Sequence, residues 1–221
     1  MKKSIFNYSI IYNSSLIFRT FARKNHIMNR IQQAIQDSIE VKQQILNTPA
    51  LLSSLEKAID ICINTLKNNG KILFCGNGGS AADAQHLAAE LSGRFYFDRP
   101  PLNAEALHVN TSFLTAVAND YSYDEIFARM TRAQGRSGDT IIGLSTSGNS
   151  PNVLRAFYVA KELKMNIIAF TGKSGGKMRE QADVLLNVPS NDTPRIQESH
   201  ILLGHLLCEF VESRMFPNFN Q

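Results

Sequence analysis

Two side chains that can bind a metal or move a proton, His86 and Glu90, stand four positions apart in an alanine-rich segment. At 3.6 residues per turn they share one face of a helix. Directly before them, residues 76–80 read Gly-Asn-Gly-Gly-Ser and follow a short apolar run, residues 72–75. A strand, a glycine-rich turn and a helix start form a unit that binds anions through free backbone N–H groups. This combination indicates chemistry on a small phosphorylated molecule.

The glycine-rich turn has no Gly-Lys-Ser/Thr sequence and is therefore not a Walker A loop. Gly76, Gly78 and Ala81 match the Gly-x-Gly-x-x-Ala pattern of dinucleotide-binding folds. That pattern requires an acid at the end of the next strand, whereas Glu105 falls inside the expected strand. A dehydrogenase is therefore a distant alternative, and a purely structural turn is a closer one.

A second candidate site is the segment 145–150, Ser-Thr-Ser-Gly-Asn-Ser, which ends at Pro151. Pro151 suits the first turn of a helix, and Ser150 suits its N-cap. Capping alone does not explain four hydroxyls and an amide within six residues. Such donors at a positive helix end predict binding of a compact phosphate monoester, without help from lysine or arginine.

A third candidate lies in the final helical segment, where Gln197 and His205 are eight positions apart and share a face. His200 points away from His205. A single histidine on an apolar stripe is more often a core residue than a ligand. If His205 meets His86 and Glu90, however, the set suits a divalent metal such as zinc, or a proton-transfer pair. A fourth candidate, Asn119-Asp120, is either a helix break or a binder of sugar hydroxyls.

The elements that must position these residues alternate between strand-like and helical runs. Strands are expected at 72–75, 104–109, 140–144, 166–170 and 184–188, and helices at 31–41, 51–66, 81–91, 123–134, 151–163 and 195–215. Gly70 is expected to end the second of these helices. The pattern predicts an α/β fold, a single doubly wound five-stranded parallel sheet flanked by helices with extra N-terminal helices. Its ligands should bind beyond the carboxyl ends of the strands.

The 221 residues carry a net charge of +4, but residues 1–27 alone contribute +5 and the remainder is −1. We therefore expect no nucleic-acid partner. No apolar stretch approaches the length of a transmembrane helix, so no membrane partner is expected. Residues 1–27 are interpreted as a disordered or untranslated leader and residues 28–221 as the domain. Three widely spaced cysteines indicate buried thiols and a cytoplasmic location.

Taken together, these motifs resemble the sugar isomerase (SIS) domain family, and within it the bacterial phosphoheptose isomerases. The resemblance covers residues 28–221 and rests on Gly76–Ser80, His86-x-x-x-Glu90, Asn119-Asp120, Ser145–Ser150 and residues 195–198, Arg-Ile-Gln-Glu. It implies a flavodoxin-like sheet and a homotetramer with active sites between subunits. It also implies conversion of sedoheptulose 7-phosphate to D-glycero-D-manno-heptose 7-phosphate, the first step toward ADP-heptose and lipopolysaccharide.

The resemblance also assigns roles to residues. Glu90 and His205 would be catalytic, and one zinc ion per subunit would be bound by His86, Glu90, Gln197 and His205. The substrate would be contacted by Asn77, Gly78, Gly79, Ser80, Glu90, Asn119, Asp120, Ser145, Thr146, Ser147, Ser150 and Gln197. Pro194 stands where some members have an acid, so a role for that acid is not transferred to this chain.

Two related functions are alternatives. One is a non-enzymatic SIS adaptor that binds the bacterial replication initiator, in which the position of Glu90 typically lacks a carboxylate. The other is a sugar-phosphate sensor, which usually carries a DNA-binding segment, whereas residues 1–50 contain no basic helix-turn-helix. His86, Glu90, Gln197 and His205 together favour the enzyme.

Overall fold

The computed structural model describes the backbone of residues 8–219 and the side chains of residues 27–218. The helices are α1 (Tyr8–Leu46), α2 (Pro49–Lys67), α3 (Gly79–Ser92), α4 (Thr111–Asp120), α5 (Ile126–Gln134), α6 (Pro151–Glu162) and α7 (Thr193–Met215), with 3₁₀ turns η1 (Tyr123–Glu125), η2 (Gly176–Glu180) and η3 (Pro217–Phe219). The strands are β1 (Ile72–Gly76), β2 (Ala104–Ala106), β3 (Thr140–Ser145), β4 (Asn166–Thr171) and β5 (Val184–Asn187).

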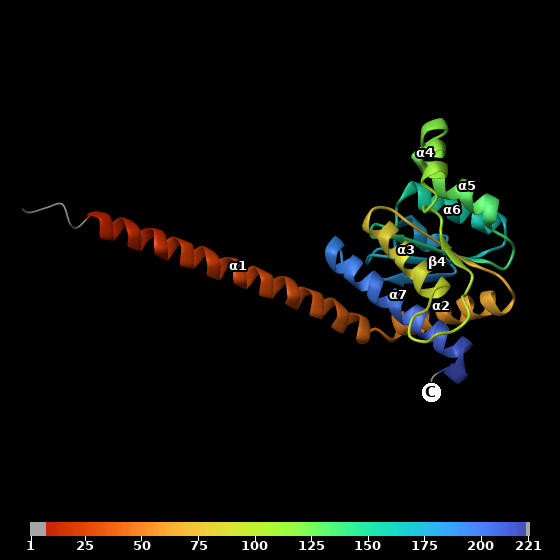
Figure 1. Ribbon diagram of the computed structural model, residues 1–221, viewed down its shortest axis with the longest axis horizontal. Helices are drawn as coiled ribbons and strands as arrows, with labels where there is room; N and C mark the ends of the chain where they lie inside the picture. Colours follow the sequence, from red (N-terminus) through yellow and green to blue (C-terminus); the bar gives the residue numbers. More distant parts are fainter. Residues whose placement is uncertain (1–7, 220–221) are drawn as a thin grey trace, which may run out of the picture. The chain divides into compact units, whose positions relative to one another are not determined.

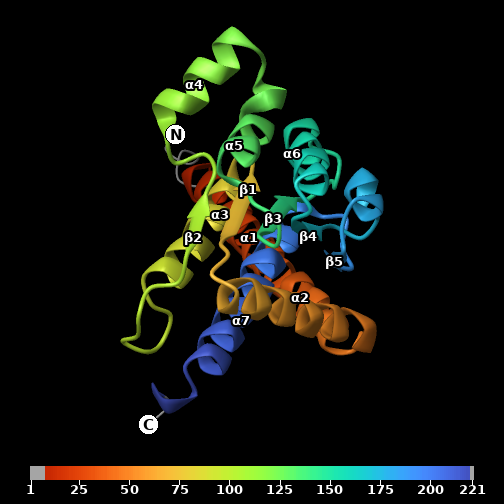
Figure 2. The ribbon, with the colours of Figure 1, turned by 90° about the vertical axis from the view of Figure 1, so that its right-hand side faces the viewer.

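The strands form one parallel sheet in the order β2-β1-β3-β4-β5 (Figure 2). Helices α3 and α7 lie side by side (Figure 1). The predicted doubly wound five-stranded sheet is confirmed. In parallel sheets both faces are covered, and accordingly every residue of β1 and β3 is buried. The carboxyl ends of the strands, where the candidate loops begin, therefore meet at one edge.

Alternate side chains of each strand enter different cores, as the two-residue period of a strand requires. Phe74 and Ile142 join a core with α2, α3 and α7 on one face of the sheet. Leu73 and Ile141 join a core with α4, α5 and α6 on the other face. The helix pair that carries His86, Glu90 and His205 therefore covers a single face.

The segment after β2 differs from the expected strand 104–109, because β2 ends at Ala106. Asn110 accepts a hydrogen bond from the Phe113 N–H at 3.0 Å and thereby caps helix α4, which the sequence patterns did not predict. Only Val117 of α4 is buried, but Phe113, Leu114 and Ala118 pack against the same core, so the helix carries a short apolar stripe that the sequence analysis overlooked. At the end of α2 the left-handed residue is Asn69 (φ 58°) rather than Gly70. Gly70 is nevertheless required, because a Cβ there would lie 2.9 Å from the Thr65 carbonyl oxygen.

Among the described residues, those up to Glu40 form one unit and those from Val41 onward form another. In the first unit, α1 begins at Tyr8, well before Met28, and exposes Ile31, Ile35 and Ile39 at four-residue spacing. Residues 1–7 of the expected leader lie outside the described part of the chain, and the status of residues 1–27 stays a prediction. Of the helices described, none is long and apolar enough to cross a membrane.

Candidate active site

Three of the predicted metal-binding or catalytic side chains meet on the α3–α7 face. The Nε2 atom of His86 lies 3.0 Å from Nε2 of His205 and 3.1 Å from Oε1 of Glu90. Donor atoms from these three residues all fall within 4.8 Å of one another. The side chains of His86 and Glu90 are 49% and 24% exposed, so a ligand can reach them. The predicted meeting of the helical His/Glu pair with His205 is thus present.

The close approach of α3 and α7 makes this meeting possible. At Gly204, a Cβ would lie 2.5 Å from Leu87 Cδ1, so any larger residue there would force the buried Leu87 side chain to shift. Leu87 is the residue after His86, and Gly204 is the residue before His205. Both are buried. The packing contact therefore brings the two imidazoles together.

The donor set of this cluster fits zinc. Two imidazole nitrogens and a carboxylate oxygen are ligands that zinc accepts, and a tetrahedral ion holds a fourth ligand as well. Gln197, the fourth predicted ligand, lies two turns earlier on α7, with its Nε2 atom 2.8 Å from the position of a Cβ on Gly79. The structure thus brings Gln197 to the glycine-rich turn, and its metal-binding role stays a prediction.

Asp83 is a further acid near this cluster that the sequence analysis missed. It lies three residues before His86 on α3, at a spacing that places both on one side of the helix. Burial raises the pKa of its carboxyl group, while the charges of His86 and His205 act in the opposite direction. The i, i+3 spacing to His86 could have indicated this residue.

The glycine-rich turn leads directly into α3. Gly78 takes a positive φ of 57° and occupies the N-cap without a side-chain cap. The N-terminal end of α3 therefore has no side chain competing with an anion for its N–H groups. Ser80, predicted to bind substrate, is buried, and its backbone lies against Gly76. Its predicted contact with substrate stays a prediction.

Asn77 is held by a pair of reciprocal amide hydrogen bonds to Asn152, each 2.8 Å long. The Tyr123 hydroxyl also donates to Asn77 Oδ1 at 3.1 Å. Asn152 is buried on α6, so this pair joins the glycine-rich turn to the helix that follows the serine-rich loop. The sequence analysis missed Asn152 and Tyr123, because both act through residues distant in the chain.

In the serine-rich loop, Ser150 occupies the N-cap of α6 as predicted, but its side chain makes no capping hydrogen bond. Its hydroxyl instead pairs with that of Ser145 at 2.8 Å, and Ser145 also lies 3.4 Å from Ser147 Oγ. Asn149 donates its backbone N–H to Ser147 Oγ at 3.1 Å. The predicted hydroxyl cluster is therefore present.

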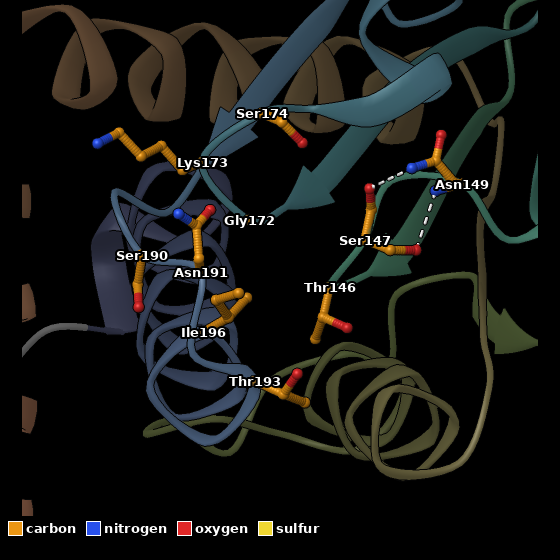
Figure 3. Close-up of a pocket in the computed structure, with 10 residues that line it drawn as sticks. All are labelled: Thr146, Ser147, Asn149, Gly172, Lys173, Ser174, Ser190, Asn191, Thr193 and Ile196. Atoms are coloured by element: carbon orange, nitrogen blue, oxygen red, sulfur yellow. Dashed lines mark hydrogen bonds between the residues drawn. The ribbon is translucent and has the colours of Figure 1, made fainter.

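A cavity of about 320 Å³ adjoins this loop (Figure 3). In Figure 3, Thr146, Ser147 and Asn149 lie on one side, opposite Ser190, Asn191 and Thr193. The remaining lining residues are Gly172, Lys173, Ser174 and Ile196. The segments after β4 and β5 were not singled out from the sequence, although both begin at the ligand-binding edge of the sheet.

Asn119 and Asp120 are the last two residues of α4, and both are exposed. Asn119 Nδ2 donates to Asp120 Oδ1 at 2.9 Å. Helix α4 packs against η1 and α5 on the opposite sheet face from the His/Glu cluster. Within the described part of the chain, no side-chain hydrogen bond or ion pair joins this pair to the other candidate residues, and their substrate role stays a prediction.

His200 is the core histidine of α7. It is fully buried, donates from Nε2 to the Thr171 carbonyl oxygen at 3.1 Å, and packs edge-on against Phe170. Its Nδ1 atom has no hydrogen-bond partner within the described residues. Burial lowers the pKa of His200 to about 4, although the hydrogen bond to Thr171 acts in the opposite direction.

This burial predicts a pH dependence of stability. Between pH 6.5 and pH 4 the unfolded chain binds a proton at His200 and the folded chain does not, so the free energy of unfolding falls as the pH falls. We expect His200 to account for a loss of about 2–3 kcal/mol between pH 7 and pH 4.5. Urea unfolding of the wild type and of His200→Gln at both pH values measures this loss of unfolding free energy. An equal loss in the wild type and in His200→Gln would contradict this role of His200.

Comparison with known proteins identifies the class and then the family. The family model described as SIS domain matches residues 21–172. The phosphoheptose isomerase of Burkholderia pseudomallei (strain 1710b) is 49% identical over 87% of this chain and 98% of its own. That of Mycobacterium bovis (strain BCG / Pasteur 1173P2) is 53% identical over 84% of this chain and 94% of its own. The solved phosphoheptose isomerase of Neisseria gonorrhoeae has a TM-score of 0.80 at 46% identity, over 85% of this chain and 99% of its own. The chain belongs to the phosphoheptose isomerase family of SIS-domain proteins.

Proposed function

We propose that this chain interconverts sedoheptulose 7-phosphate and D-glycero-D-manno-heptose 7-phosphate. The observation that carries the proposal is the course of α7 between the two halves of the site. Thr193 and Ile196 line the cavity beside the serine-rich loop, Gln197 lies against Gly79, and His205 belongs to the His/Glu cluster. One helix therefore runs from a pocket that suits a phosphate to a cluster that can move protons.

The phosphate would be held by neutral donors of the serine-rich loop and by the N-terminal end of α6. Ser145, Thr146, Ser147 and Ser150 offer hydroxyl groups at this position, and helix N-termini favour anions. Asn77, Gly78 and Gly79 would contact the sugar, because Gly78 has open space where a Cβ would stand and so leaves the start of α3 accessible to a ligand.

Isomerisation requires removal of a proton from the carbon beside the carbonyl and return of a proton one carbon over, through an enediol. We assign proton transfer to Glu90 and His205, an acid and an imidazole that lie in one partly exposed cluster. The carboxylate of Glu90 would take the carbon-bound proton. The His205 imidazole would move a proton at the neighbouring oxygen.

A zinc ion would be held by His86, Glu90, His205 and Gln197. When bound, it would polarise the sugar carbonyl as a Lewis acid. The support for zinc is the convergence of two imidazole nitrogens and a carboxylate within 4.8 Å.

The experiment that tests the function is incubation of the purified protein with sedoheptulose 7-phosphate, with added zinc and with chelator, followed by NMR. Formation of the heptose phosphate supports the isomerase, and loss of turnover in chelator that zinc reverses supports the metal. No conversion by folded, zinc-supplemented protein would refute the function and favour the adaptor.

We also propose a homotetramer in the cytoplasm, with active sites completed between subunits. The support for a shared site is that Asn119 and Asp120 are exposed on the sheet face opposite the His/Glu cluster, where they are free to reach the site of another subunit. The support for the cytoplasm is that Cys62, Cys75 and Cys208 are free and buried. Light scattering measures the mass of the assembly.

One residue of the serine-rich loop provides a direct test of phosphate binding. Ser147→Ala should raise the KM for sedoheptulose 7-phosphate by about 10-fold or more, because a hydrogen bond to a charged group contributes about 1.5–3 kcal/mol. Steady-state kinetics measures KM, with Ser213→Ala on α7 as a control, since the Ser213 hydroxyl bonds the local Phe210 carbonyl oxygen. An unchanged KM would remove Ser147 from the phosphate site.

A further inference from the structure

A buried ion pair links helix α7 to the segment that follows α3. Arg99 Nε donates to Glu212 Oε1 at 3.0 Å, and both side chains are 0% exposed. Arg99 follows α3 by seven residues, and Glu212 lies on α7, seven residues after His205. The pair therefore connects the two helices that carry the cluster.

The Arg99 side of the pair holds the end of α3. Its guanidinium donates to the carbonyl oxygens of Glu90 at 2.9 Å, Leu91 at 2.7 Å and Gly93 at 2.9 Å. The last carbonyls of a helix have no partners within the helix, so a buried helix end needs donors from elsewhere. Arg99 supplies them at the turn from which the Glu90 carboxylate projects.

The Glu212 side holds the segment that follows α3. Its carboxylate accepts the backbone N–H groups of Phe95 at 2.8 Å, Tyr96 at 2.6 Å and Phe97 at 3.2 Å. Burial raises the pKa of Glu212, but these N–H groups and Arg99 outweigh burial and lower it. The Phe95 ring in turn lies 5.8 Å from the His205 ring, centroid to centroid.

We propose that the Arg99–Glu212 pair is a positioning device that sets the distance between Glu90 and His205. Arg99 fixes the backbone of Glu90, and Glu212 fixes Phe95 against the His205 ring. The inference rests on the proposed function, because it assigns the pair to the same catalytic and metal-binding cluster. Neither residue touches the reacting atoms.

The test compares Glu212→Gln with Asp139→Asn. Asp139 is also buried and paired, with Lys71 Nζ at 2.6 Å, but its carboxylate bonds Lys71 and Arg136, which precede β1 and β3, rather than residues of α3 or α7. Both changes remove a buried carboxylate charge, so both should destabilise the chain. Only Glu212→Gln should change the cluster.

Turnover kinetics, zinc affinity and the His205 ring resonances are measured at a temperature where circular dichroism shows folded protein. We expect Glu212→Gln to lower kcat and zinc affinity about 10–100-fold, the range for partners of metal ligands, with KM within about 3-fold. Its His205 ring resonances should shift in metal-free NMR spectra. Asp139→Asn should leave all three near wild type. Wild-type values in folded Glu212→Gln, or equal losses in Asp139→Asn, would overturn the proposal.

If Glu212→Gln does not fold, the charge-free double variant Arg99→Met/Glu212→Leu replaces it, since apolar substitutes for a buried ion pair often preserve stability. It should show the same losses, and wild-type values would overturn the proposal. A wild type inert toward sedoheptulose 7-phosphate would refute the proposed function alone, because the His205 resonances and zinc affinity still report on the pair.

Discussion

Glu90→Gln should reduce kcat by about 10³-fold or more while the protein stays folded. General acid–base catalysis contributes about 10²–10⁴-fold to the rate. Because Glu90 is also a proposed metal ligand, the decrease in kcat should lie at the high end of that range. Glutamine keeps the shape of the side chain but cannot accept the proton. The only ion pair of Glu90 among the described residues is with His86, and it is partly exposed. Such pairs contribute about 0–1 kcal/mol, so the stability of the variant should hardly change.

Turnover of sedoheptulose 7-phosphate followed by NMR measures the effect, and thermal unfolding checks the fold. Glu56→Gln is the matched control, because Glu56 is an exposed glutamate on α2. Activity of Glu90→Gln near that of the control would exclude proton transfer by Glu90.

His86→Ala should abolish stoichiometric zinc binding, with affinity falling more than about 100-fold. Changing only the partner of a metal ligand costs about 10–100-fold, and removal of a ligand should exceed that range. His86 Nε2 lies within 3.1 Å of both other donors of the cluster, so no described group can take its place without moving. Calorimetric titration with zinc measures the affinity.

The matched control is His108→Ala. His108 follows β2 and lies outside the cluster, so its loss removes one histidine without touching a proposed ligand. We expect zinc binding at wild-type affinity in that variant. Equal affinities in His86→Ala and His108→Ala would refute the metal site, whatever the two variants do to turnover.

The sequence predicted the strands well because parallel strands buried on both faces leave continuous apolar runs, as in residues 72–75 and 140–144. The glycine-rich and serine-rich loops were found because their residue types suit anions and follow such runs. Helix α4 was missed although Phe113, Leu114, Val117 and Ala118 recur at helical spacing, because the short segment lies between the expected strand 104–109 and the expected break at Asn119-Asp120. Ser150 was assigned correctly as an N-cap, but its hydroxyl bonds Ser145 instead of the helix.

The sequence by itself determined the local chemistry: His86 and Glu90 share a face because the helical period puts them there. Only the tertiary structure decided that His205, 119 positions after His86, joins them, because that depends on the contact of Gly204 with Leu87. The same holds for the Arg99–Glu212 pair, whose members are 113 positions apart. Spacing along one element fixes which side chains share a face, whereas packing between elements decides which faces meet.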